Sequence, residues 1–212
     1  MEKNSVIFFD FDGTIADTMS HLTGIMNRIS GEFGFKKIKK EDLEKLKGER
    51  TKDVFGKIGI PIIRIPVVLK KTRQILTGII SKIKPIQGMP EVLNLLKEEG
   101  YKLGIITSAP KESVDKFLEK NGLNLFDFIY SEGNIFGKDK VMTNIMKEKN
   151  LNPKQVFYVG DETRDIEAAK RAGIKTIAVT WGFNNEKILL KESPDHLIKK
   201  PADLLEILRK KP

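Results

Sequence analysis

Four aspartates come directly after short apolar runs that have the composition of buried strands. Asp10 and Asp12 follow Val6–Phe9, and Asp161 and Asp165 follow the run at 156–159. Like charges a few ångströms apart raise one another's pKa values and reduce stability, so a chain that gathers them needs a compensating positive charge. Carboxylates, a main-chain carbonyl and waters are ligands that suit Mg²⁺. If the four aspartates converge, they predict a magnesium site.

A phosphate ester in such a site would complete the chemistry. One aspartate can attack phosphorus and form an aspartyl-phosphate, and a second carboxyl group can protonate the leaving oxygen and later activate water. A lysine and a threonine hydroxyl would bind the remaining phosphate oxygens, with help from N–H groups at helix N-termini. Residues of the right types lie next to the apolar runs or before a helix: Gly13, Thr14, Thr107, Ser108, Lys138 and Lys140.

Five short apolar runs, separated by amphipathic stretches, must position these residues. The runs are Val6–Phe9, Leu103–Thr107, Phe128–Ser131, Val156–Val159 and Thr176–Val179. Most are apolar throughout, which is typical of a parallel sheet that is covered on both faces. The alternation with helices predicts right-handed crossovers and a doubly wound, Rossmann-like α/β fold. Such folds bind ligands at the carboxyl ends of their strands, where the polar residues would converge.

Residues 16–85 break this alternation. Their apolar residues recur at helical spacing without a strand–helix unit, as in Leu22, Ile25, Met26, Ile29 and Phe33. We therefore expect a small all-helical domain, residues 16–85, inserted after the first strand. The sheet domain would comprise residues 1–15 and 86–212.

The motifs, taken in order, resemble those of the haloacid dehalogenase-like (HAD) hydrolase superfamily. They are DFDGTIADT, GIITSAP, a lysine before a helix, and GDETRD, and together they span nearly the whole chain. The stretch VTWGFNN…SPDHLIKKPADLLEIL is also similar to phosphoglycolate-phosphatase-like members. The resemblance implies a type-1 helical cap in the position of the insert. It also implies Mg²⁺-dependent hydrolysis of a small phosphomonoester through an aspartyl-phosphate.

The resemblance implies a role for each aspartate. Asp10 would be the nucleophile and a metal ligand, and Asp12 would be the general acid/base that also offers its backbone carbonyl to Mg²⁺. Asp161 would bind the metal, and Asp165 would bind it or support a ligand. The dehalogenases of the superfamily lack the second aspartate of the first motif, because their intermediate is a carbon ester. Asp12 therefore favours phosphoryl transfer over dehalogenation.

The other motif residues would bind the phosphoryl group. Thr107 would hold it, with Ser108 beside it, and Lys138 would screen the charge of nucleophile and phosphate. Lys140 is an alternative to Lys138, because both lie in the sequence GKDK. Arg164 is expected to form a surface ion pair rather than to contact substrate.

The segment 48–53 lies where a type-1 cap would contact the leaving group of the substrate and select for it. Glu49 and Arg50 in this segment would meet a polar or anionic leaving group. A solvated loop between helices is an equally good interpretation.

The composition of the chain excludes several kinds of functional site and argues against some kinds of partner. The chain has 212 residues, no cysteine and two histidines, so disulfides, thiol nucleophiles and multi-histidine metal sites are excluded. The net charge is +9, but the lysines are scattered and form no basic block with interleaved aromatics, so we expect a small phosphorylated metabolite and no nucleic acid. No apolar run reaches the roughly 18 residues of a membrane span. A strand near the N-terminus leaves no room for a signal peptide, so we expect no membrane association and a cytoplasmic location.

Three other functions stay open on the sequence. A phosphomutase of the β-phosphoglucomutase type would share the aspartyl-phosphate but return the phosphoryl group to a sugar. A non-catalytic binding module with the same fold would lack turnover, although an intact set of motifs argues against it. Nucleic-acid binding has only the net charge in its favour. The oligomeric state is not predicted.

Overall fold

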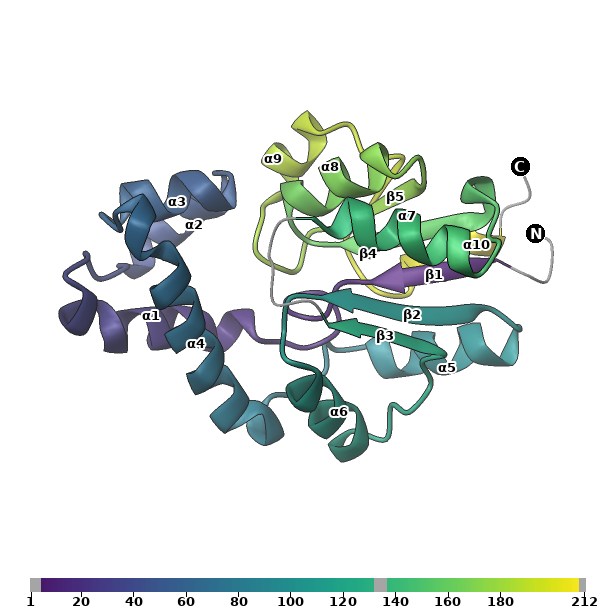
Figure 1. Ribbon diagram of the computed structural model, residues 1–212, viewed down its shortest axis with the longest axis horizontal. Coiled ribbons are helices and arrows are strands. Elements are labelled where there is room, and N and C mark those ends of the chain that lie inside the picture. Colours follow the sequence, from purple (N-terminus) through teal and green to yellow (C-terminus); the bar gives the residue numbers. More distant parts are fainter. Residues whose placement is uncertain (1–4, 132–136, 210–212) are drawn as a thin grey trace.

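The computed structural model describes residues 5–131 and 137–209, and within these ranges it contains a six-stranded parallel sheet (Figure 1). The strands are β1 (Val6–Phe9), β2 (Lys102–Thr107), β3 (Phe128–Ser131), β4 (Val156–Gly160), β5 (Lys175–Val179) and β6 (His196–Ile198). Their order is β3-β2-β1-β4-β5-β6. The doubly wound α/β fold is confirmed, and each predicted strand lies within one residue of its expected bounds. The short edge strand β6 is an addition that the apolar pattern does not predict.

Both faces of the sheet are buried, which explains why the strands are apolar throughout. In β1, Ile7 and Phe9 pack into one apolar cluster, and Val6 and Phe8 pack into another on the opposite face. The first face is covered by α5 (Met89–Glu98), α6 (Lys111–Lys120) and α10 (Asp203–Arg209). The second is covered by α7 (Lys138–Glu148) and α8 (Thr163–Arg171). Helix α9 (Glu186–Lys191) packs beside α8 through Leu189, and the short helix η4 (Pro153–Gln155) precedes β4.

The chain between β1 and α5, residues 16–85, forms helices and loops and is called the helical segment below. It contains α1 (Met19–Phe33), η1 (Lys40–Asp42), α2 (Leu43–Lys47), α3 (Thr51–Lys57), η2 (Ile62–Arg64), α4 (Ile65–Ile79) and η3 (Ile80–Lys82). Its two ends meet at an antiparallel bridge between Ala16 and Pro85. Met26, Phe55 and Val68 belong to an apolar cluster whose members all come from this segment. The helical segment therefore has an apolar cluster of its own.

The strand register brings the predicted site residues to one edge of the sheet. Phe9 of β1 lies opposite Ile105 of β2 and Val159 of β4. Asp10, Thr107 and Asp161, at or just after the ends of these strands, therefore lie at the same edge of the sheet, at the point where the strand order reverses. The carboxyl ends of the strands point toward the helical segment (Figure 1).

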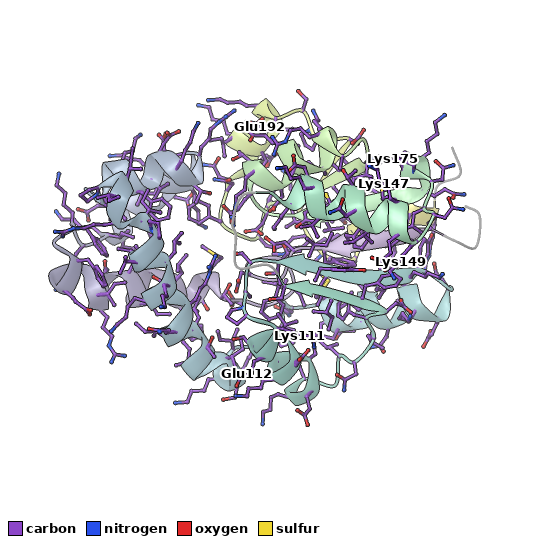
Figure 2. The ribbon with its side chains drawn as sticks, viewed as in Figure 1. Lys111, Glu112, Lys147, Lys149, Lys175 and Glu192 are labelled. Atoms are coloured by element: carbon purple, nitrogen blue, oxygen red, sulfur yellow. The ribbon has the colours of Figure 1, made fainter. Side chains whose placement is uncertain are left out.

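The charged side chains are distributed over many elements. Lys111 lies on α6, Lys147 and Lys149 lie at the C-terminal end of α7, and Lys175 lies on β5 (Figure 2). Several exposed lysines pair with carboxylates one helical turn away, as Lys111 does with Asp115. Among the described residues, none of the helices combines the length and apolar character that a membrane crossing requires.

Candidate active site

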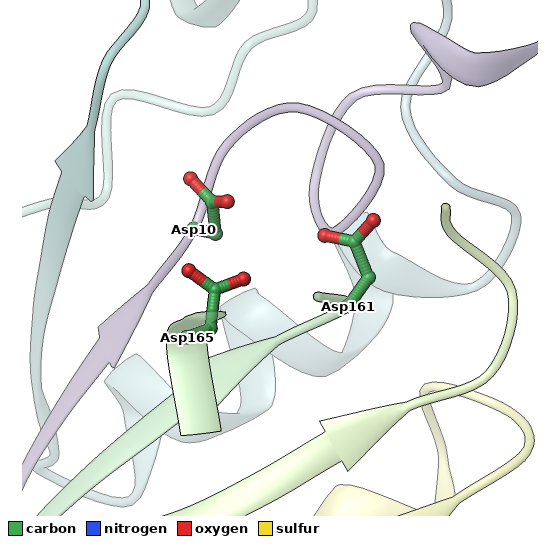
Figure 3. A group of neighbouring side chains, drawn as sticks. All are labelled: Asp10, Asp161 and Asp165. Atoms are coloured by element: carbon green, nitrogen blue, oxygen red, sulfur yellow. The ribbon is translucent and has the colours of Figure 1, made fainter. Parts of the chain in front are cut away.

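Three of the four predicted aspartates converge at the carboxyl edge of the sheet. Asp10, Asp161 and Asp165 are buried, and each places a carboxylate oxygen within 4.8 Å of the others (Figure 3). Asp10 follows β1, Asp161 follows β4, and Asp165 lies in the first turn of α8. We refer to these three residues as the aspartate cluster.

Lys138 supplies the positive charge inside this cluster. Its Nζ atom lies 2.9 Å from Asp10 Oδ2 and 2.7 Å from Asp165 Oδ1. It also donates to the Tyr158 hydroxyl at 2.8 Å, and that hydroxyl donates to the carbonyl of Ile106 at 3.2 Å. Burial works to lower the pKa of Lys138, but the Asp10 and Asp165 carboxylates raise it above its ordinary value. The lysine is therefore held as a cation by its two acidic partners.

Lys140, the alternative motif lysine, is exposed two residues further along α7. Lys138 is the one that contacts the cluster. Tyr158, which anchors Lys138, was not among the predicted site residues. Its position within an apolar strand gave no reason to separate it from the core.

The cluster holds more negative charge than Lys138 can compensate. Burial raises the pKa of Asp161 well above its usual value, and the carboxylates of Glu162, Asp10 and Asp165 raise it further. Burial also raises the pKa of Asp165, although Lys138 opposes this. Buried, closely spaced carboxylate oxygens are a hard donor set of the kind that divalent cations select. The cluster is therefore compatible with a divalent metal ion.

The surroundings of Asp161 hold its carboxylate in place. Thr14 Oγ1 donates to Asp161 Oδ1 at 2.8 Å, and the Phe183 backbone N–H donates to Asp161 Oδ2 at 2.7 Å. A Cβ atom at Gly13 would lie 2.4 Å from Asp161 Oδ2, and one at Gly182 would lie 2.2 Å from the same atom. Both positions therefore require glycine as long as Asp161 keeps this position.

Gly182→Ala is expected to displace Asp161 and to lower the free energy of unfolding by about 1–3 kcal/mol, as for other overpacked sites. Urea unfolding would measure the stability, and calorimetric titration with a divalent cation such as Mg²⁺ would test whether binding at the cluster weakens. Gly56→Ala is the matched control, because a Cβ atom there meets nothing within 4 Å and alanine favours the helix. Unchanged Mg²⁺ affinity and stability in Gly182→Ala would contradict the close contact.

Asp12 lies in the loop after β1 and is not part of the aspartate cluster. Burial of its carboxyl group, and then the negative charge of Asp10, raise the pKa of Asp12 to about 6. A carboxyl group with a pKa near neutrality can both give and take a proton under working conditions. This is the property that a general acid/base needs.

Thr107 and Ser108 lie at the end of β2, beside the start of the Asp10 loop. Thr107 is buried, and its Oγ1 accepts a hydrogen bond from the Ala109 backbone N–H at 3.0 Å. Ser108 is partly exposed. Gly13 and Thr14 contact the cluster through Asp161, so they support a cluster member.

Glu49 and Arg50 are engaged with protein groups. Arg50 pairs with Glu167 at 3.0 Å and with Glu192, the residue that follows α9 and is labelled in Figure 2. Glu49 pairs with Lys57 within the helical segment. Arg50 also lines a cavity of about 170 Å³ between the helical segment and helices α7 and α8. Other lining residues include Lys52, Lys138, Thr163, Arg164 and Arg171.

Arg164 forms the expected ion pair, but not at the surface. It pairs with Glu162, and only 19% of its side chain is exposed. Glu162 is at the same time the N-cap of α8, where Asp165 completes a reciprocal capping box. The helical segment lies against this end of α8, since Thr51 Oγ1 donates to the Glu162 carboxylate.

Arg73 is a charged residue whose electrostatic link to the site the sequence does not reveal. It lies on α4 one turn before Leu76 and Thr77, which contact the sheet domain, so it occupies the side of the helix that faces that domain. Burial and the positive charge of Arg164 lower the pKa of Arg73, and the negative charge of Asp12 opposes this. Arg73 therefore lies near both residues. No local pattern could have indicated this, because the three residues come from distant parts of the chain.

Comparisons with known proteins agree with this geometry. The family model of the haloacid dehalogenase-like hydrolases matches residues 7–179. The phosphoglycolate phosphatase of Synechococcus elongatus is 31% identical over 201 residues, which cover 94% of this chain and 95% of that protein. The pyrophosphatase PpaX of Bacillus mycoides is 26% identical over 211 residues, which cover 97% of each chain.

A solved structure shows the same fold. A haloacid dehalogenase-like family hydrolase from Streptococcus pneumoniae aligns with a TM-score of 0.82 at 24% identity, and covers 99% of this chain and 100% of that one. With a family model that spans most of the chain, a relative of nearly the same length and the motif residues gathered at one edge of the sheet, the chain belongs to the haloacid dehalogenase-like hydrolases.

Proposed function

We propose that the protein is a Mg²⁺-dependent phosphatase that hydrolyses a small phosphate ester through an aspartyl-phosphate on Asp10. The observation that carries the proposal is the buried aspartate cluster around Lys138, with Asp12 beside it. The names of the relatives, phosphoglycolate phosphatase and pyrophosphatase, support phosphoryl transfer to water.

The proposed reaction has two steps. A carboxylate oxygen of Asp10 attacks phosphorus, the bond from phosphorus to the leaving oxygen breaks, and Asp12 gives its proton to that oxygen. Asp12 then takes a proton from water, the water oxygen attacks phosphorus, and the Asp10 carboxylate is released together with inorganic phosphate. Lys138 and Thr107 hold the phosphoryl oxygens. Mg²⁺, held by Asp10, Asp161 and the Asp12 carbonyl with Asp165 in support, would supply positive charge that offsets the phosphoryl oxygens.

We further propose that the helical segment is a cap domain, with residues 1–15 and 86–212 as the core. Its separate apolar cluster and its position beyond the carboxyl ends of the strands support this division (Figure 1). A cap in this position would exclude water from the aspartyl-phosphate until hydrolysis.

The charges around the cluster favour a substrate whose leaving group carries a second anion. Arg73 comes from the helical segment and Arg164 from α8, and both lie near Asp12, the proposed proton donor to the leaving oxygen. Phosphoglycolate has a carboxylate, and pyrophosphate a second phosphate, in that position. Arg50 remains a candidate for the same role only if its ion pairs with Glu167 and Glu192 open, and Glu49 could contact only a polar leaving group.

Arg73→Ala is expected to raise the KM of a phosphate ester with a carboxylate-bearing leaving group about tenfold, because a charged contact is lost. The KM for p-nitrophenyl phosphate should change little, since its leaving group has no carboxylate. Steady-state kinetics on both esters measures the difference. Arg28→Ala is the control, because Arg28 is exposed on α1. An equal effect on both esters would contradict an anion-binding role.

The function is tested by phosphate release from p-nitrophenyl phosphate and a panel of small phosphate esters, with Mg²⁺ and with EDTA. Mg²⁺-dependent release that EDTA abolishes supports the proposal, and the best ester defines the substrate class. Product analysis separates the mutase, which would yield a phosphorylated isomer in place of inorganic phosphate. Folded protein that binds Mg²⁺ but neither releases phosphate nor forms an isomer would indicate a binding module.

A further inference from the structure

Asn184, in the loop between β5 and α9, joins the helical segment to the sheet domain. Its side chain is fully buried, and its Nδ2 donates to the carbonyls of Lys47 at 3.1 Å and Glu49 at 2.8 Å. Its Oδ1 accepts from the Thr163 backbone N–H at 2.9 Å, at the N-terminus of α8. The Asn184 amide therefore donates two hydrogen bonds to the helical segment and accepts one from the sheet domain.

The backbone of the same loop holds Asp161. The Asn184 N–H donates to the Asp161 carbonyl at 3.2 Å, and the preceding N–H, of Phe183, donates to Asp161 Oδ2 at 2.7 Å. Gly182 approaches the same carboxylate too closely for any side chain. The position of this loop therefore decides where the Asp161 carboxylate lies.

The contacts around Asn184 are polar. The Asn185 N–H donates to the Lys47 carbonyl at 3.0 Å, Thr51 bonds Glu162, and Arg50 pairs with Glu167. The apolar cluster of the helical segment contains no residue of the sheet domain. Residues 44–51 can therefore leave the β5–α9 loop without exposing an apolar core, and water can replace each hydrogen bond.

We propose that Asn184 is a positioning residue that couples the docking of residues 44–51 to the position of Asp161, and hence to metal binding. When residues 44–51 dock, the Asn184 amide is fixed between two carbonyls and Thr163, and the loop places its N–H groups on Asp161. Because coupling between two sites is reciprocal, a cation bound at Asp161 favours docking by the same factor by which docking favours the cation. This coupling rests on the proposed metal-dependent function and adds a link between metal binding and cap closure.

Two variants test the coupling without using turnover. Asn184→Ala removes all three side-chain hydrogen bonds, whereas Asn184→Asp keeps an acceptor for Thr163 and places a carboxylate against two carbonyls. We expect calorimetric titration to show Mg²⁺ affinity about 5- to 10-fold weaker in both variants, the lower range of measured coupling. Asn94→Ala is the control, since Asn94 is exposed and its Nδ2 donates to the Pro90 carbonyl one turn earlier in the same helix. Mg²⁺ affinity equal to wild type in folded Asn184→Asp would overturn the proposal.

A second measurement needs no variant. Amide hydrogen exchange in residues 44–51 of the wild-type protein should slow when Mg²⁺ is added, because the metal favours docking. If the protein binds Mg²⁺ but the exchange rates of residues 44–51 do not change, the coupling is overturned. The proposed function is not affected by that result. A wild-type protein that binds no Mg²⁺ would instead refute the proposed function.

Discussion

If Asp10 is the nucleophile as proposed, Asp10→Asn is expected to reduce Mg²⁺-dependent phosphate release by a factor on the order of 10⁴ or more, because an amide cannot replace the attacking carboxylate and such losses accompany removal of other nucleophiles. The fold should persist, since the amide has nearly the same shape. Lys138 keeps Asp165 as a partner at 2.7 Å. Phosphate release under saturating Mg²⁺ measures the loss, and circular dichroism checks the fold.

The matched control for this variant is Asp53→Asn, which changes an exposed aspartate on α3 to the same amide. It should keep wild-type activity. Rapid acid quench offers a second readout, because the wild type should retain phosphate on the protein and Asp10→Asn should not. Phosphate release within tenfold of wild type in folded Asp10→Asn would rule out Asp10 as the nucleophile.

Lys138→Met is expected to lower the free energy of unfolding by about 3–5 kcal/mol and to abolish activity, because it leaves buried carboxylates without their cation. The side chain of Lys138 is 6% exposed and contacts both Asp10 and Asp165, so water cannot replace its charge. Urea unfolding in EDTA measures the loss. Mg²⁺ should restore part of the stability, because a ligand that binds only the folded state shifts the equilibrium toward it.

Lys140→Met is the control for this substitution, with the same chemical change two residues away on an exposed side chain. It should alter stability by less than about 0.5 kcal/mol, as surface substitutions usually do. Equal losses in the two variants would show that Lys138 does not serve as the counter-charge of the cluster.

The sequence by itself determined where most of the strands lie and which polar residues follow them, because local composition records both. A strand covered on both faces must be apolar at successive positions, so Val6–Phe9 and Val156–Val159 are recognisable without any partner. Polar residues directly after such strands then place Asp10 and Asp161 at one edge. The strand β6 was not predicted, because three residues are too few to show an apolar pattern. Its extended conformation depends on its pairing with β5.

Only the tertiary structure decided which side chains meet. Lys138 contacts the aspartate cluster whereas Lys140 is exposed, because packing of Val141, Met142 and Ile145 against the sheet orients α7, and residues two apart on a helix point in different directions. Only 19% of the Arg164 side chain is exposed, because residues 44–51 lie over the start of α8, more than a hundred positions away in sequence. Asn184 gains its role in the same way, from carbonyls that no spacing in its own loop could indicate. Local patterns record secondary structure, whereas the partners of a buried polar group depend on how distant segments pack.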